Sequence, residues 1–107
     1  MIIISFILRN KTTKISVIIP TYNRGKIILN SIKSVLNQMH TNIEVIVVDD
    51  GSTHNTREEI DILGDKRVRY FKLLNHSSAV NARNIGLKYS IGSFIAFKDS
   101  DDIFYFL

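Results

Sequence analysis

Residues 15–20 read ISVIIP, residues 43–48 read IEVIVV, and residues 26–39 between them read KIILNSIKSVLNQM. Each short run is rich in β-branched apolar residues and is bounded by polar residues or proline, which is typical of a buried strand. In the intervening segment, apolar residues recur at the spacing of one helix face: Ile28, Ile32, Val35, Leu36 and Met39. Strand, helix and strand in this order form a βαβ unit, whose two strands lie parallel and side by side. These residues predict an α/β protein.

The same alternation continues along the chain. Asn55 and Glu58 have the spacing of a capping box, and Gly64 is a typical helix stop. For the last helix, Ser77 or Ser78 is available as the N-cap. The later elements are predicted at residues 55–63 (helix), 68–74 (strand), 78–89 (helix) and 93–97 (strand). The order β-α-β-α-β-α-β predicts a three-layer sandwich with helices around a mostly parallel sheet.

The overall composition fits one small domain. The chain has 107 residues, of which 45% are hydrophobic, and a formal net charge of +4. This charge suits an anionic partner, such as a phosphate-bearing ligand, and equally suits an ordinary soluble surface. The absence of cysteine excludes disulfides and thiolate metal sites, and fits a cytosolic protein.

The start of the chain is apolar, but its pattern is not the one expected of a signal peptide. The apolar run at residues 2–8 has no basic residue before it and no small-residue cleavage site after it. It is also much shorter than the roughly 20 residues that span a bilayer. We therefore expect residues 1–13 to be an N-terminal extension, either an edge strand or disordered.

Polar residues follow every predicted strand. In parallel sheets, ligands bind beyond the carboxyl ends of the strands, so we expect these four strand exits to form one site. They are Thr21-Tyr22-Asn23, Asp49-Asp50-Gly51-Ser52, Asn75-His76 and Asp99-Ser100-Asp101-Asp102. The sequence has neither G-x-G-x-x-G nor G-x-x-x-x-G-K, which argues against dinucleotide dehydrogenases and P-loop enzymes.

Each polar segment has a functional and a structural interpretation. Asp99 and Asp101 could hold a hard divalent cation, Mg²⁺ or Mn²⁺, or could form an acidic turn at the end of the sheet. Asp49 and Asp50 could bind a ligand or belong to a strand-to-helix turn that uses a positive φ at the following glycine. Arg83 could anchor a phosphate or a base edge, or pair with a carboxylate.

The three histidines, by contrast, suggest no shared site. His40, His54 and His76 have no metal-ligand spacing among them, and we interpret all three as surface or capping residues.

Three stretches together resemble the family 2 glycosyltransferases of the GT-A fold. They are ISVIIPTYNR (15–24), SIKSVLNQMHTNIEVIVVDDGSTHNT (31–56) and ARNIGLKYSIGSFIAFKDSDD (82–102). The resemblance implies a Rossmann-like nucleotide-binding half at residues 14–107 that ends soon after the D-x-D. It would bind a nucleotide-diphospho-sugar with Mg²⁺ or Mn²⁺, for sugar transfer to a glycan, lipid or protein acceptor.

The resemblance also implies roles for individual residues. Pro20, Thr21 and Tyr22 would line the base pocket, and Asp49 would contact the base edge. Arg83 would face the nucleotide. The implied substrate-binding set further includes Asn23, Asp50 and Asp99, with Asp99 near the ribose, and the implied metal ligand is Asp101.

The sequence departs from the family pattern at two single positions. His54 stands where the family usually has Asp, and Lys98 replaces an apolar residue just before the D-x-D.

A larger departure concerns the acceptor half, because the family's general base lies downstream of the D-x-D and only residues 103–107 follow here. We therefore expect an incomplete enzyme, with two alternatives: a non-catalytic nucleotide-sugar-binding module, or a truncated product. In the last case a second chain would cover the apolar edge at residues 97–107. No nucleic-acid partner is expected. The protein is expected to be cytoplasmic, and membrane association stays open because many relatives act on lipid-linked glycans.

Overall fold

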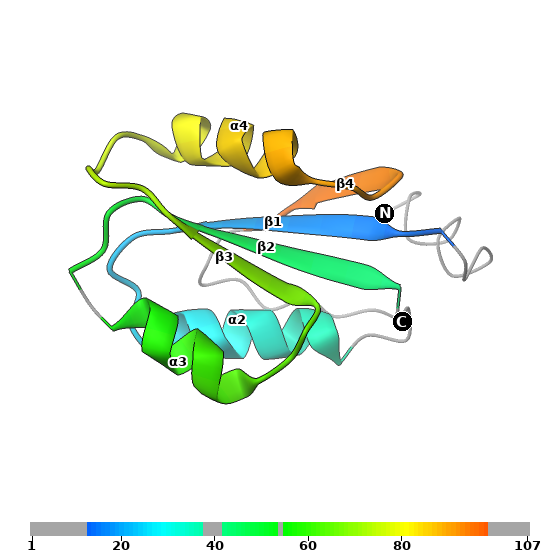
Figure 1. Ribbon diagram of the computed structural model, residues 1–107, viewed down its shortest axis with the longest axis horizontal. Helices are drawn as coiled ribbons and strands as arrows, with labels where there is room; N and C mark the ends of the chain where they lie inside the picture. Colours follow the sequence, from blue (N-terminus) through cyan, green and yellow to red (C-terminus); the bar gives the residue numbers. More distant parts are fainter. Residues whose placement is uncertain (1–12, 38–41, 54, 99–107) are drawn as a thin grey trace.

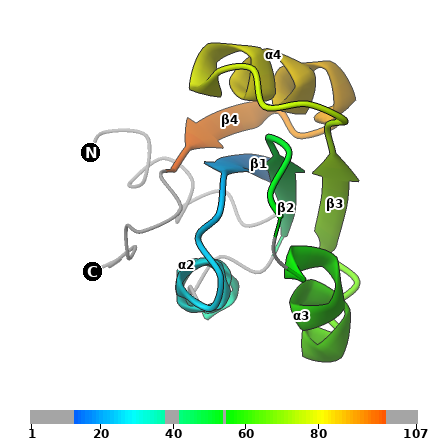
Figure 2. The same ribbon diagram turned by 90° about the vertical axis from the view of Figure 1, so that its left-hand side faces the viewer.

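The computed structural model describes residues 13–37, 42–53 and 55–98. In this part of the chain four strands and three helices alternate, and all strand pairs are parallel. The strands are β1 (Ile15–Thr21), β2 (Ile43–Asp49), β3 (Val68–Lys72) and β4 (Phe94–Phe97). The helices are α2 (Ile27–Leu36), α3 (Thr56–Leu63) and α4 (Ala79–Tyr89). Helix α4 covers one face of the sheet and helices α2 and α3 cover the other, so the three-layer α/β prediction is confirmed (Figures 1 and 2).

The strand order β3-β2-β1-β4 brings the strand exits to one edge of the sheet. The β1–β2 register runs from Ile15 opposite Ile43 to Thr21 opposite Asp49. Asp49 in turn lies opposite Lys72 of β3. The last residues of three neighbouring strands are thus level with one another, as expected for consecutive βαβ units.

The sheet separates two apolar clusters, because successive side chains of a strand point to opposite faces. The larger cluster joins the sheet to α2 and α3, and includes Val17, Ile19, Ile28, Ile32, Val35, Val45, Val47 and Ile60. The smaller cluster lies under α4 and consists of Ile18, Ile46, Val48 and Ala82, with partly buried neighbours. The continuous apolar runs in the sequence follow from this burial on both faces.

The helix starts differ from one another in a way that tests the capping predictions. Ser78 has an extended backbone (φ −163°, ψ 158°), and its Oγ accepts the backbone N–H of Asn81 at 3.1 Å, so the predicted N-cap is confirmed. Asn55 has φ −81° and ψ 46°, and its side chain makes no capping hydrogen bond. The capping-box prediction was therefore wrong, because a cap side chain reaches the first turn from extended backbone.

The remaining boundaries agree closely with the sequence, with one exception at β3. This strand ends at Lys72, two residues before the predicted end, and Leu74 is 98% exposed. The expectations for residues 1–12, for Met39 and for residues 99–107 lie outside the described residues. No helix in the described part of the chain is long and apolar enough to cross a membrane.

Candidate functional site

The loops that follow β1 and β2 are bonded to each other at the carboxyl edge of the sheet. The backbone N–H of Asp50 donates to the carbonyl of Thr21 at 2.8 Å. The N–H of Asn23 donates to Ser52 Oγ at 2.8 Å, and Asn23 Oδ1 accepts the N–H of Thr53 at 2.9 Å. Asn23 has a positive φ of 50°, a conformation that asparagine tolerates better than most residues. These bonds fix the position of the intervening Tyr22.

Asp49 is fully buried, and both of its carboxylate oxygens are in use. Oδ1 accepts the backbone N–H of Ser52 at 2.8 Å, and Oδ2 accepts the hydroxyl of Tyr70 on β3. Burial, together with the bond to this carboxylate, raises the pKa of Tyr70. Asp49 therefore shapes the turn after β2 and links that turn to the neighbouring strand.

Asp50 joins the loop after β3 to the same edge. Its Oδ1 accepts both the backbone N–H of Ser77 at 3.0 Å and the Ser77 hydroxyl at 2.9 Å. Its Oδ2 lies 3.1 Å from Nδ1 of His76. Gly51 permits this close approach, since a Cβ on it would lie 2.8 Å from the backbone nitrogen of His76. Gly51 also has a φ of +89°, as the turn interpretation of the sequence required.

An aromatic contact completes the cluster. The ring centroids of Tyr22 and His76 lie 3.9 Å apart, with an angle of 31° between the ring planes. Tyr22 is 40% exposed, and the His76 side chain is 54% exposed. The site therefore presents two accessible rings in contact with each other, and one of them, His76, also contacts the buried Asp50 carboxylate.

His76 and Ser77 were not among the predicted substrate-binding residues, although His76 belongs to one of the strand exits that were expected at this site. His76 was interpreted as a surface or capping residue, and it is indeed exposed, but it also contacts Asp50 and Tyr22. A signal was available, because the second and third strands of consecutive βαβ units lie side by side and their exits must meet.

Thr21 and Pro20 lie at the end of β1, as predicted. Thr21 is buried, and its Oγ1 has no hydrogen-bond partner within the described ranges. Leaving a buried hydroxyl unpaired costs about 1–3 kcal/mol. Thr21 is thus a candidate to bond a ligand group or a water at this edge.

The other predicted site residues are only partly tested by the geometry. Arg83 is half-buried on α4, the helix that packs on β1 and β2. Asp99 and Asp101 lie outside the described residues. Lys98, which directly precedes them, is 2% exposed, and its N–H donates to the carbonyl of Ile18 at 3.0 Å, so the backbone continues the pairing of β4 with β1.

A metal site is not formed by the residues that the structure covers. Residues 13–37, 42–53 and 55–98 contain no group of three or more His, Asp or Glu side chains that could hold an ion.

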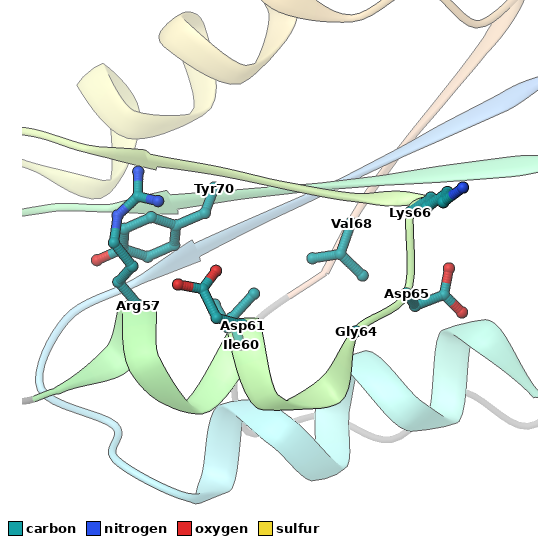
Figure 3. Close-up of a pocket in the computed structure, with 8 residues that line it drawn as sticks. All are labelled: Arg57, Ile60, Asp61, Gly64, Asp65, Lys66, Val68 and Tyr70. Atoms are coloured by element: carbon teal, nitrogen blue, oxygen red, sulfur yellow. The ribbon is translucent and has the colours of Figure 1, made fainter.

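A separate groove of about 310 Å³ lies between α3 and β3. Figure 3 shows the side chains around it, with Arg57 over the ring of Tyr70, at 5.1 Å from its centroid, and Lys66 toward the other end. The lining residues are Arg57, Ile60, Asp61, Gly64, Asp65, Lys66, Val68 and Tyr70. None of the predicted substrate-binding residues lines this groove.

The comparisons with known proteins agree with this geometry. Residues 16–106 match the model of glycosyl transferase family 2. The chain therefore belongs to glycosyl transferase family 2, as the sequence motifs indicated.

Among the relatives, an uncharacterized glycosyltransferase of Rickettsia conorii is 53% identical over 94 residues, covering 87% of this chain and 15% of the relative. The Escherichia coli protein WfgD, a UDP-Glc:alpha-D-GlcNAc-diphosphoundecaprenol beta-1,3-glucosyltransferase, is 45% identical over 89 residues, covering 83% and 35%. The structure of S. aureus TarS 1–349 in complex with UDP-GlcNAc is also similar, with a TM-score of 0.77 and 38% identity. This match covers 84% of the chain and 27% of TarS 1–349, so the chain spans only part of these longer proteins.

Proposed function

We propose that the chain binds the donor of a glycosyltransferase, a nucleotide-diphospho-sugar, at the carboxyl edge of its sheet. The observation that carries the proposal is the meeting of three strand exits around Tyr22, His76 and Asp50. An exposed aromatic ring can stack on a nucleobase, and a carboxylate oxygen can accept a hydrogen bond from a base N–H. Because a related protein was solved with UDP-GlcNAc, a uridine nucleotide is the first candidate.

The base pocket would be lined by Pro20, Thr21 and Tyr22, and Asn23 would hold its loop in place. Asp49 was expected to contact the base edge. The Asp49 carboxylate, however, is fully buried and bonded to the Ser52 N–H and the Tyr70 hydroxyl, whereas Oδ2 of Asp50 faces the exposed His76. We therefore propose that Asp50 is the better candidate for the base contact.

The diphosphate and ribose would be bound on the side of β4 and α4. In this proposal Arg83 supplies positive charge to the diphosphate. Asp99 contacts the ribose, and Asp101 holds a Mg²⁺ or Mn²⁺ ion. Such an ion, when bound, neutralises the charge that develops on the diphosphate leaving group.

Transfer to an acceptor belongs to the same proposal. The chain spans 15% of the Rickettsia relative and 35% of WfgD, so the acceptor and the transfer step are inferred for a longer assembly. The name of WfgD includes a diphosphoundecaprenol-linked sugar, which supports a lipid-linked sugar as acceptor. The alternative function is donor binding without turnover.

Calorimetric titration of UDP into the protein, with and without Mn²⁺, tests the donor site. We expect binding that requires Mn²⁺ and is lost in Asp101→Ala, while Asp61→Ala, which removes an exposed carboxylate from α3, binds as the wild type does. If folded wild-type protein binds neither UDP nor GDP in the presence of Mn²⁺, the proposed function is wrong. Release of sugar from UDP-glucose would distinguish an enzyme from a binding module.

A further inference from the structure

The imidazole of His76 contacts both the Tyr22 ring and the Asp50 carboxylate. It lies against Tyr22 at a centroid distance of 3.9 Å, and its Nδ1 is 3.1 Å from Asp50 Oδ2. The same nitrogen is 3.3 Å from the backbone carbonyl oxygen of Asp50. Because both neighbours of Nδ1 are acceptors, Nδ1 carries the hydrogen and donates it. The imidazole thus offers Tyr22 a flat face and offers Asp50 an N–H group.

These are the two contacts that a nucleobase would make at the same place. A uracil or guanine ring is planar, stacks on aromatic side chains and carries a ring N–H. This inference rests on the proposed donor site. We infer that His76 is a placeholder: before the donor binds, its imidazole makes the contacts with Tyr22 and Asp50 that the base makes afterwards. Donor binding then displaces the imidazole from these contacts.

The surroundings of His76 would allow its side chain to move away from Tyr22 and Asp50 while its backbone keeps its position. The side chain is 54% exposed, so it can rotate into solvent without breaking an apolar core. Its backbone nitrogen is held close to Gly51, where a Cβ would lie only 2.8 Å away. Rotation about the side-chain bonds therefore suffices, and the loop need not move.

The carboxylate of Asp50 is equally well suited to exchange one donor for another. Its Oδ1 is fixed by the backbone N–H and the hydroxyl of Ser77, at 3.0 and 2.9 Å. When His76 leaves, Asp50 stays in position and Oδ2 becomes free to accept the N–H of the base. The exchange keeps one hydrogen bond and one stacking contact in each state.

The placeholder lowers donor affinity by the fraction of time that it covers the site. When the competent state is populated only fractionally, the apparent Kd rises by the inverse of that fraction. Removing the imidazole should therefore tighten binding. We expect His76→Ala to bind UDP about three- to tenfold more tightly than the wild type in the presence of Mn²⁺.

The matched control is Leu74→Ala, which shortens a fully exposed side chain of the same loop and should leave the Kd for UDP unchanged. Weaker binding of UDP by His76→Ala would mean that the imidazole contacts the bound nucleotide, and it would overturn the inference. An unchanged Kd would overturn it as well. If the folded wild type binds neither UDP nor GDP, the proposed function fails and the inference falls with it. Wild-type binding therefore separates the two failures.

A second measurement follows the imidazole directly. In the proton NMR spectrum, the His76 ring signals should be shifted upfield by the Tyr22 ring, and Tyr22→Leu should remove the shift. Saturating UDP with Mn²⁺ should move the wild-type signals to the positions of an exposed histidine. Signals that stay shifted while UDP is bound would contradict displacement.

Discussion

The hydroxyl of Tyr70 donates a hydrogen bond to the carboxylate of Asp49, which ties the outer strand β3 to the end of the central strand β2. The backbone reinforces this link, since the N–H of Leu73 donates to the carbonyl of Asp49 at 2.8 Å. The loop after β3 starts from this fixed point and carries His76 and Ser77 to Asp50. The Tyr70–Asp49 hydrogen bond therefore helps to hold His76 and Ser77 in position at the candidate donor site.

Tyr70→Phe should destabilise the protein. The substitution leaves one oxygen of the buried Asp49 carboxylate without its donor, which costs about 1–3 kcal/mol of unfolding free energy. Urea denaturation measures the change. Tyr89→Phe is the control, because the Tyr89 ring stacks on Phe71 while its hydroxyl has no hydrogen-bond partner in the described part of the chain. Equal stability of Tyr70→Phe and Tyr89→Phe would show that the bond contributes nothing.

Gly86→Ala should also destabilise, although alanine is the better helix former. A Cβ on Gly86 would lie 2.4 Å from Cγ2 of Ile18, so α4 would have to move away from β1. Overpacking of this kind costs about 1–3 kcal/mol, whereas the gain in helix propensity is at most about 1 kcal/mol. Asn84→Ala, at an exposed position of the same helix, should be neutral or slightly stabilising. A more stable Gly86→Ala protein in thermal unfolding would contradict the close contact.

Substitutions of Asn23 should lower the stability of the protein through two effects: loss of its side-chain acceptor and strain at its positive φ. Asn23→Gly removes the acceptor for the N–H of Thr53 but suits the positive φ, while Asn23→Ala loses the acceptor and is strained as well. We expect both variants to be less stable than the wild type, and Asn23→Ala to be the less stable of the two by about 1 kcal/mol. Differential scanning calorimetry can rank the three proteins, and an alanine variant as stable as the glycine variant would argue against strain at this turn.

The fold was predictable because the apolar runs report burial directly. β1 and β2 are buried on both faces, so their sequences are mostly apolar, interrupted near the start by Ser16 and Glu44, which bond each other. Helix α2 shows its buried face as Ile28, Ile32 and Val35. The end of β3 was less predictable. Leu73 and Leu74 continue the apolar run, but the strand ends at Lys72; the N–H of Leu73 still bonds β2, and Leu74 is exposed. Local composition cannot anticipate where an outer strand loses its partner.

The location of the site was predictable from the sequence, but its side-chain contacts were not. The strand exits could be read from the sequence, and the exits after β1, β2 and β3 do meet at one edge. The different contacts of Asp49 and Asp50 could not be predicted from the sequence. Adjacent residues point to opposite sides of the chain, and only the packing shows that Asp49 bonds Tyr70 and that Asp50 contacts His76. The contact between Tyr22 and His76 joins two loops and has no local signature.

At the opposite end of the sheet, Glu44 is a buried carboxylate whose environment makes stability depend on pH. Burial by itself raises its pKa, but hydrogen bonds from the Ser16 hydroxyl at 2.6 Å, the Ile91 N–H at 2.7 Å and the Arg69 guanidinium at 3.0 Å outweigh burial. The net effect lowers the pKa of Glu44 below its ordinary value. The charged form is thus bound more tightly in the folded state than in the unfolded chain.

The sign of the pH dependence follows from this lowered pKa. The stabilisation is fully present above the pKa that Glu44 has in the unfolded chain, about 4.3, and is lost as the pH falls through its lower folded value. Ser16→Ala removes one donor, so the pKa of Glu44 should rise and acid unfolding should begin at a higher pH. Glu44→Gln should be less stable than the wild type at pH 7 and should show a flatter stability profile below pH 5.

Asp65 provides the comparison for this last experiment. A hydrogen bond from Arg67 lowers the pKa of Asp65 as well, but both side chains are partly exposed, at 26% and 33%. Solvent screens such a pair, so Asp65→Asn should change the acid limb of the profile much less than Glu44→Gln does. Urea unfolding at a series of pH values between 3 and 7 measures all four proteins. Equal effects of the two substitutions would mean that burial does not determine how much Glu44 contributes to the pH dependence of stability.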